Sequence, residues 1–270
     1  MVTYPNCKIN LGLHIVHRRD DGYHDIESIF LPVKEVCDKL EIMPIDNAPS
    51  GVCRFSQTGL ALDNAPDDNL CVKAYRLMHN EFGDKIKGVE MTLDKRIPFG
   101  AGLGGGSADA AFVLKMLNDI FALGLNDDEL RERAAKIGAD CPFFIANRAA
   151  YVSGIGDILA PIDLDLAAMG LRIEIDKPDD YVSTKEAYAG VTPRDRRAGY
   201  INGSHNLIDA VRRPIEEWRE ILVNDFEKSI FHTHPAIDEA KRKMYERGAV
   251  YAAMSGSGSA VFGLFKTKHS

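Results

Sequence analysis

Five of the seven residues from Gly100 to Gly106 are glycine, and an apolar, proline-free stretch follows them. Glycine loses more backbone entropy on folding than any other residue, so an ordered run of glycines needs a reason. Glycines let the backbone approach a ligand and expose successive N–H groups, and the first N–H groups of a helix attract anions. The run therefore predicts a phosphate-binding loop that leads into a helix near Ser107. The alternative is a glycine-rich turn with Ser107 as an ordinary helix cap.

Known glycine loops fit this run to different degrees. A Walker A loop needs a lysine and a Ser or Thr after its last glycine, and no lysine follows Gly106. Gly100, Gly102 and Gly105 match the G-x-G-x-x-G spacing of a dinucleotide loop, but Pro98 and a charged turn precede them instead of a buried strand. The other signature segments of protein kinases are absent. The hypothesis of an NAD-dependent oxidoreductase is therefore supported by the glycine spacing alone.

Composition restricts the function classes. The chain has 270 residues, 45% of them apolar, and a net charge of −7, which argues against a nucleic-acid backbone as partner. No apolar run approaches the roughly 18 residues of a membrane helix, and the first residues do not resemble a signal peptide. The five cysteines are odd in number and lack CxxC spacing, so we expect a reduced, cytoplasmic protein with no membrane partner.

Hydrophobic periodicity divides the chain into two halves, of which the second begins near Ser153. Alternation from Cys7 to Ile15 predicts a half-buried strand whose polar face carries Lys8 and Asn10. Further strands are expected at 26–33, 38–43 and 88–93. Helices are expected at 69–82 with Asp68 or Asn69 as cap, at 107–124, and at 126–138 with Asn126 as cap. The second half is expected to form a small layer, with strands at 171–175, 249–254 and 260–265 and helices at 184–189, 214–225 and 236–247.

The segment "PFGAGLGGGSADAA" resembles the phosphate loop of the GHMP kinases, the family of galactokinase and of homoserine, mevalonate and phosphomevalonate kinases. "KINLGLHI" with "RRDDGYHDIES", "DNLCVKA", "GADCPFF" and "MSGSGSAVFG" are also similar to that family. Lys8 and "DGYH" point to the branch that phosphorylates the 2-hydroxyl of a cytidine diphosphate-linked polyol for isoprenoid synthesis. The resemblance implies an α+β architecture of two domains, a nucleotide-binding N-terminal half (residues 1–155) and a ferredoxin-like C-terminal half (residues 156–270). It also implies ATP with Mg²⁺ as cofactor.

The resemblance also implies roles for individual residues. Asp140 would accept the hydroxyl proton and Lys8, paired with it, would stabilise the attacking oxygen; from the residues alone, Asp140 could equally be a turn residue that bonds its own backbone. The implied ATP-binding residues are Asn69, Lys95, Pro98, Phe99, Gly100, Ala101, Gly102, Leu103, Gly104, Gly105, Gly106, Ser107 and Ala108, and Ser107 is also the candidate Mg²⁺ ligand. The implied acceptor-binding residues are Asn10, Tyr23, His24, Tyr181 and Thr184.

Tyr23 offers a ring on which a pyrimidine can stack, and His24 offers a donor and an acceptor for the edge of a cytosine. Gly256 and Gly258 form a second glycine loop, which is either a further family motif or a simple hairpin turn. His232 and His234 are too few for a metal site. Three other functions stay open: a GHMP-type kinase for homoserine or a sugar, a non-catalytic nucleotide or metabolite sensor, and the oxidoreductase. The chain is expected to be a monomer or a homodimer.

Overall fold

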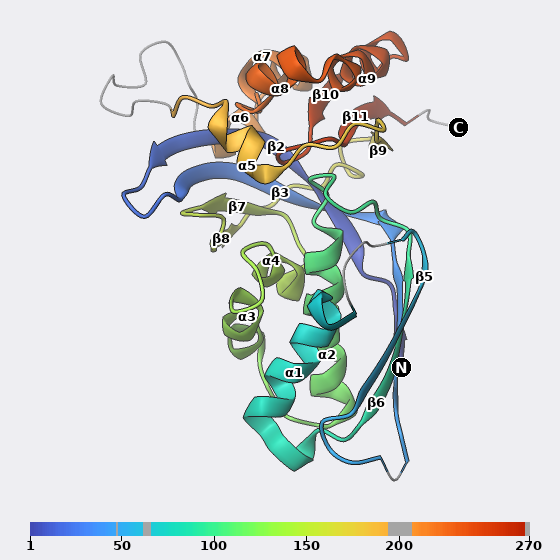
Figure 1. Ribbon diagram of the computed structural model, residues 1–270. Helices are drawn as coiled ribbons and strands as arrows, with labels where there is room; N and C mark the ends of the chain where they lie inside the picture. The colour runs from blue at the N-terminus through green and yellow to red at the C-terminus, as the bar shows by residue number, and fades with distance from the viewer. Residues whose placement is uncertain (47, 62–65, 194–206, 268–270) are drawn as a thin grey trace. The chain divides into compact units, whose positions relative to one another are not determined.

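The computed structural model describes residues 1–46, 48–61, 66–193 and 207–267 (Figure 1). The chain forms two compact units. Unit 1 consists of Met1–Cys7, Pro32–Phe99 and Gly104–Arg148, and unit 2 of Lys8–Leu31, Gly100–Leu103 and Ala149–Ser270. The chain passes from unit 1 to unit 2 for the last time between Arg148 and Ala149, near the domain boundary expected at residue 155. Unit 2 also contains residues from before that boundary.

Unit 1 is built on a four-stranded sheet with the order β1-β4-β6-β5. Its strands are β1 (Val2–Thr3), β4 (Lys39–Pro44), β5 (Cys53–Gly59) and β6 (Val89–Lys95). β5 and β6 run parallel, which requires a crossover, and α1 (Leu70–Phe82) provides it. α1 packs beside α2 (Gly105–Ile120), and the shorter α3 (Asp127–Ala135) and α4 (Cys141–Ala146) complete this layer (Figure 1). Because the other strand pairs are antiparallel, the sheet is mixed and differs from the parallel sheet of a dinucleotide-binding domain.

Local capping explains where the helices of unit 1 begin. The Asn69 side chain accepts the N–H of Cys71 at 2.9 Å at the start of α1, and Asn126 forms a capping box with Glu129 at the start of α3. Both caps confirm the sequence prediction. α2 begins two residues earlier than expected, at Gly105, after Gly104 in a left-handed conformation (φ 70°).

Unit 2 contains two sheets. The first has the order β2-β3-β7-β8, formed by β2 (Asn6–Arg18), β3 (His24–Cys37), β7 (Ala150–Ser153) and β8 (Ile158–Pro161). The first two residues of β2 and the end of β3 from Pro32 are assigned to unit 1. The second has the order β10-β11-β9, formed by β9 (Leu171–Asp176), β10 (Tyr251–Met254) and β11 (Val261–Lys266). The helices of unit 2 are α5 (Thr184–Ala189), α6 (Leu207–Ala210), α7 (Trp218–Ile221), α8 (Glu227–Thr233) and α9 (Pro235–Glu246). The three-stranded sheet β10-β11-β9, together with these helices, confirms the small α+β layer expected for the second half.

Two sequence predictions for unit 2 are wrong. The helix expected over 214–225 is reduced to a 3-10 turn, Ile215–Glu217, and the short α7. The segment after α7 instead pairs with β2, because the Leu13 N–H donates to Val223 O (2.9 Å) and the Asp225 N–H donates to Leu13 O (2.8 Å). β2 is not half-buried but buried on both faces from Asn6 to Val16, so its polar side chains must bond within the protein.

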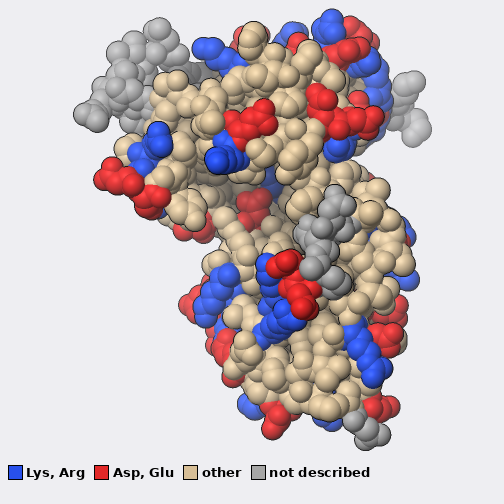
Figure 2. All heavy atoms as spheres, in the orientation of Figure 1, with Lys and Arg blue, Asp and Glu red and all other residues tan. Residues whose placement is uncertain are grey.

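The surface carries charges of both signs. On the face shown in Figure 2, Lys and Arg side chains are interspersed with Asp and Glu, and each unit carries both. None of the helices in the described part of the chain is long and apolar enough to cross a membrane.

Candidate active-site residues

The glycine run ends where α2 begins, in unit 1. The cap residue Gly104 has no side chain to accept a hydrogen bond from the first turn, so Ser107 is not an ordinary helix cap. A Cβ added at Gly106 would contact only Leu70 Cδ1, at 3.7 Å, so packing of this segment does not require glycine there. The first turn of α2 thus offers backbone N–H groups and the positive end of a helix dipole to an anion.

Asp140 occupies the cap position of α4, also in unit 1, and its half-buried side chain makes no capping hydrogen bond. The next residue, Cys141, is fully buried, and its thiol is within reach of the Ser107 hydroxyl in the first turn of α2. Burial, together with the charge of Asp140, raises the pKa of the Cys141 thiol to about 12. The Cys141 thiol therefore stays protonated at neutral pH.

Lys95 lies inside unit 1 and is 1% exposed. Its Nζ donates to the carboxylates of Asp38 and Asp109, the latter at 2.9 Å. Asp38 also accepts the backbone N–H groups of Arg96 (2.5 Å) and Ile97 (2.8 Å). Burial disfavours the ammonium, but Asp109 and Asp38 outweigh it and raise the pKa of Lys95. Lys95 is therefore a cation committed to two carboxylates just before the glycine run.

The other predicted ATP-binding residues differ in exposure. Asn69 is 8% exposed, and its side-chain oxygen is used to cap α1. Phe99 is 55% exposed, whereas Ala101, Leu103 and Ala108 are buried. Gly104–Ala108 belong to unit 1 and Gly100–Leu103 to unit 2.

Lys8 and Asn10 lie side by side on β2 in unit 2, at 3% and 1% exposure. Lys8 Nζ donates to Asn10 Oδ1 at 2.7 Å and to the carbonyl of Gly102 at 3.0 Å, and it lies 4.6 Å from the centroid of the Phe30 ring. Asn10 Nδ2 donates to Ser28 Oγ at 2.9 Å. β2 thus holds the Lys8 ammonium against the carbonyl of Gly102, which belongs to the glycine run.

The second glycine loop packs backbone to backbone on the first, within unit 2. A Cβ at Gly102 (φ 73°) would lie 1.9 Å from the carbonyl oxygen of Ser255, so only glycine fits there. Ser255 Oγ donates to Gly102 O at 2.8 Å, and Ala260 N–H donates to Ala101 O at 3.1 Å. The loop is also the connection between the antiparallel strands β10 and β11, so it is a hairpin turn that holds the first glycine segment.

Tyr23 and His24 lie at the turn between β2 and β3. Tyr23 is 60% exposed, and the turn is closed by its carbonyl, which accepts the Arg19 N–H at 2.8 Å. The His24 ring stacks on Tyr188 of α5 at 4.7 Å between centroids. Burial, with the charges of Arg18 and His17, lowers the pKa of His24. A neutral imidazole results, with one donor and one acceptor nitrogen.

Tyr181 and Thr184 are exposed and belong to unit 2 as well. The Tyr181 ring lies over Gly100, where a Cβ would be 2.8 Å from Cε2. Thr184 is the first residue of α5, which Ser183 caps. The sequence analysis did not single out Tyr188, although it lies four residues after Thr184 on the same helix. It gave no role to Ser28 or Ser255, although both lie in segments that resemble the family, "RRDDGYHDIES" and "MSGSGSAVFG".

Known proteins share both sequence and fold with this chain. Residues 69–160 match the family model of the GHMP kinases N terminal domain, and residues 207–270 match that of the GHMP kinases C terminal domain. The chain is 49% identical over 268 residues to the 4-diphosphocytidyl-2-C-methyl-D-erythritol kinase of Bacteroides thetaiotaomicron, covering 98% of this chain and 92% of the relative. Identity to the protein of the same name from Bacteroides fragilis is 48% over 265 residues, with the same coverage.

Solved structures agree with these relatives. A crystal structure of 4-(cytidine 5'-diphospho)-2C-methyl-D-erythritol kinase superposes with a TM-score of 0.79 at 32% identity, covering 99% of this chain and 91% of that one. A crystal structure of mevalonate kinase superposes with a TM-score of 0.71 at 13% identity, covering 98% and 91%, and so shares the fold. The chain therefore belongs to the GHMP kinase family, in the branch whose members carry the name 4-diphosphocytidyl-2-C-methyl-D-erythritol kinase.

Proposed function

We propose that this chain transfers the γ-phosphoryl group of ATP to the 2-hydroxyl of 4-diphosphocytidyl-2-C-methyl-D-erythritol, giving the 2-phosphate and ADP. The observation that carries the proposal is 48–49% identity to proteins of that name along 98% of the chain. The uncapped start of α2 supports it, because an anion can take the place that a capping side chain leaves open.

Phosphoryl transfer depends on positioning and on charge stabilisation. We assign the phosphates of ATP to the glycine run and the first turn of α2, from Gly100 to Ala108. Pro98 and the exposed ring of Phe99, which directly precede this segment, and the capping residue Asn69 complete the proposed nucleotide site. Lys95, whose ammonium is committed to its ion pairs, contributes by holding the segment that precedes the run.

Asp140 is the proposed acceptor for the hydroxyl proton. A carboxylate is a far weaker base than an alkoxide, so it does not remove the proton before reaction, but it can orient the hydroxyl and take the proton as the bond to phosphorus forms. Lys8 is the proposed cation that stabilises the attacking oxygen, since β2 and Asn10 fix the direction of its ammonium.

Mg²⁺ would neutralise charge on the ATP phosphates. This ion uses one or two protein oxygens together with phosphates and water, and the Ser107 hydroxyl in the first turn of α2 is the oxygen that we propose. Among the described residues no group of three or more His, Cys, Asp or Glu could hold a metal ion.

The acceptor would be recognised in unit 2. His24 in its neutral form can donate to and accept from the edge of a cytosine, and Tyr188 holds its ring plane. The exposed rings of Tyr23 and Tyr181 offer faces for stacking, and Thr184 offers a hydroxyl for the diphosphate or ribose. The five free cysteines fit a reducing, cytoplasmic location.

The proposal is tested by coupled ADP release with ATP, Mg²⁺ and four acceptors: 4-diphosphocytidyl-2-C-methyl-D-erythritol, homoserine, mevalonate and galactose. We expect turnover with the cytidine compound alone. Turnover with homoserine or galactose instead would identify a sibling kinase, and binding of ATP without turnover of any acceptor would identify a sensor.

A further inference from the structure

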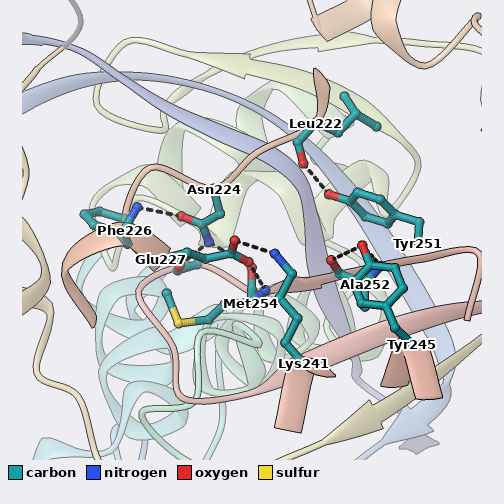
Figure 3. A network of polar contacts seen from close by, with 10 residues as sticks. Leu222, Asn224, Phe226, Glu227, Lys241, Tyr245, Tyr251, Ala252 and Met254 are labelled. Carbon is teal, nitrogen blue, oxygen red and sulfur yellow. Dashed lines mark hydrogen bonds and ion pairs between the residues drawn. The ribbon is translucent and has the colours of Figure 1, made fainter. Parts of the chain in front are cut away.

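Side chains cover the outer edge of β10 (Figure 3). One edge of this strand pairs with β11. On the other edge, the N–H and C=O of Ala252 both bond the Tyr245 hydroxyl, at 3.1 and 3.2 Å. The Met254 N–H donates to Glu227 Oε1 and the Met254 carbonyl accepts from Asn224 Nδ2, both at 2.8 Å. An edge strand that would otherwise expose its backbone is thus satisfied by side chains.

Asn224 does more than cover this edge. Its Nδ2 donates a second hydrogen bond to the Gly256 carbonyl at 2.8 Å, and its Oδ1 accepts the Phe226 N–H at 3.0 Å. The two carbonyls that it binds, those of Met254 and Gly256, flank Ser255. The side chain is 3% exposed, so the amide of Asn224 holds the backbone on both sides of Ser255 in a place from which water is excluded.

Ser255 and Gly256 in turn contact the first glycine segment. Ser255 Oγ donates to the Gly102 carbonyl at 2.8 Å, which also accepts from Lys8 Nζ at 3.0 Å. A Cβ at Gly256 would lie 3.1 Å from Gly102 Cα, so the two backbones touch. The backbone on either side of Asn224 is tied to Leu13 of β2, the strand that carries Lys8. Asn224 therefore joins the second glycine loop to β2 and, through Ser255, to Gly102.

We propose that Asn224 is a positioning residue for phosphoryl transfer: by clamping the carbonyls on either side of Ser255, it sets the place of Gly102 and of the ammonium bonded to it. This inference rests on the proposed function, since it assigns the glycine run to ATP. A small displacement of such a group is costly, because a shift of about 1 Å can reduce a rate by about 10²-fold.

The test compares Asn224→Asp with Tyr245→Phe. Asn224→Asp keeps the oxygen that accepts from Phe226 but replaces the donor of two hydrogen bonds by an oxygen that faces two carbonyls. Tyr245→Phe also removes two hydrogen bonds from the edge of β10, at Ala252 and away from the loop. Both variants are expected to lower Tm. Only Asn224→Asp is expected to lower kcat, by about 10²-fold, with the acceptor KM nearly unchanged.

ATP affinity, measured by calorimetry without acceptor, provides a readout that does not depend on the proposed acceptor. We expect it to fall about tenfold in Asn224→Asp and to stay at the parental value in Tyr245→Phe. If the parental chain binds ATP but does not use the cytidine compound, the acceptor assignment fails while this comparison still decides the role of Asn224. Equal behaviour of the two variants in ATP affinity would overturn the inference.

Should Asn224→Asp not fold, Ser255→Ala takes its place, because it removes the hydroxyl that bonds Gly102 and leaves the backbone clamp. A fall in ATP affinity of several-fold is expected. Parental ATP affinity in Ser255→Ala would overturn the link from this loop to the nucleotide site. Where both single variants fold, the double variant should lose less than the product of the single losses, since both act through Gly102.

Discussion

Replacing Lys95 by methionine should destabilise the protein strongly and in a pH-dependent way. The side chains of Lys95, Asp38 and Asp109 are 1%, 0% and 2% exposed. Lys95→Met preserves the approximate volume but leaves two carboxylates in the interior with no cation between them. Removal of one partner of a buried ion pair costs about 3–5 kcal/mol. For a chain of this size, about 2–4 °C of Tm accompanies each kcal/mol, so Tm should fall by about 6–20 °C.

The pH dependence follows from Asp109. Burial raises the pKa of its carboxyl to about 7, although Lys95 acts in the opposite direction. Because this folded-state pKa lies above the ordinary value near 3.9, protonation favours folding: the contribution is complete below about pH 3.9 and is lost as the pH rises through about 7. Without Lys95 the folded-state pKa of Asp109 rises further, so the variant continues to lose stability after the parent has stopped, and the difference between them should widen as the pH rises above about 7.

The assay is urea unfolding followed by circular dichroism at several pH values. Lys95→Met with Asp109→Asn is the matched control, since it removes one of the two orphaned carboxylates while Asp38 keeps its bonds from Arg96 and Ile97. This double variant should be more stable than Lys95→Met and should lose most of the added pH dependence. A Lys95→Met protein within about 1 kcal/mol of the parent at every pH would refute the reasoning.

Three further predictions concern the proposed site. Gly106→Ala should leave Tm unchanged or slightly raised, since its Cβ meets only Leu70 at 3.7 Å. ATP affinity should nevertheless fall about tenfold. Parental ATP affinity by calorimetry would exclude this glycine from the phosphate site. In the parent, the acceptor KM should rise at acidic pH, because the pKa of His24 is lowered and the imidazole becomes charged only at a pH below its ordinary pKa near 6.5. His24→Gln should abolish this rise. A parental acceptor KM that does not change with pH would exclude His24 from the contact. Asp140→Asn should lower kcat by about 10²–10⁴-fold with little change in either KM, and a folded variant with near-parental kcat would return Asp140 to the role of a turn residue.

The sequence predicted best those features that depend on neighbouring residues. The caps at Asn69 and Asn126 and the bounds of α5 follow from local hydrogen bonding, and the structure confirms them. The helix expected over 214–225 failed for the opposite reason. The last residues of this segment form backbone hydrogen bonds with Leu13, about 210 residues away in sequence. No local sequence pattern indicates such a distant partner.

The candidate site shows the same division. The glycine run, Lys8 and Asp140 could be found because motifs and resemblance mark them. The ion pairs of Lys95 with Asp38 and Asp109 join residues 57 and 14 positions apart, and an isolated lysine in a sequence is usually solvated. Asn224 lies in a segment that its sequence pattern assigned to a helix, whereas its side chain serves the loop after β10.

The proposed function is tested most directly by identifying the product. The chain would be incubated with ATP, Mg²⁺ and 4-diphosphocytidyl-2-C-methyl-D-erythritol, and the mixture followed by phosphorus NMR. We predict one new phosphomonoester, on the 2-hydroxyl of the erythritol unit, for each ADP formed, with no such signal in Asp140→Asn over the same period. ADP with free phosphate and no new phosphomonoester, or a phosphomonoester at another position, would contradict the assignment.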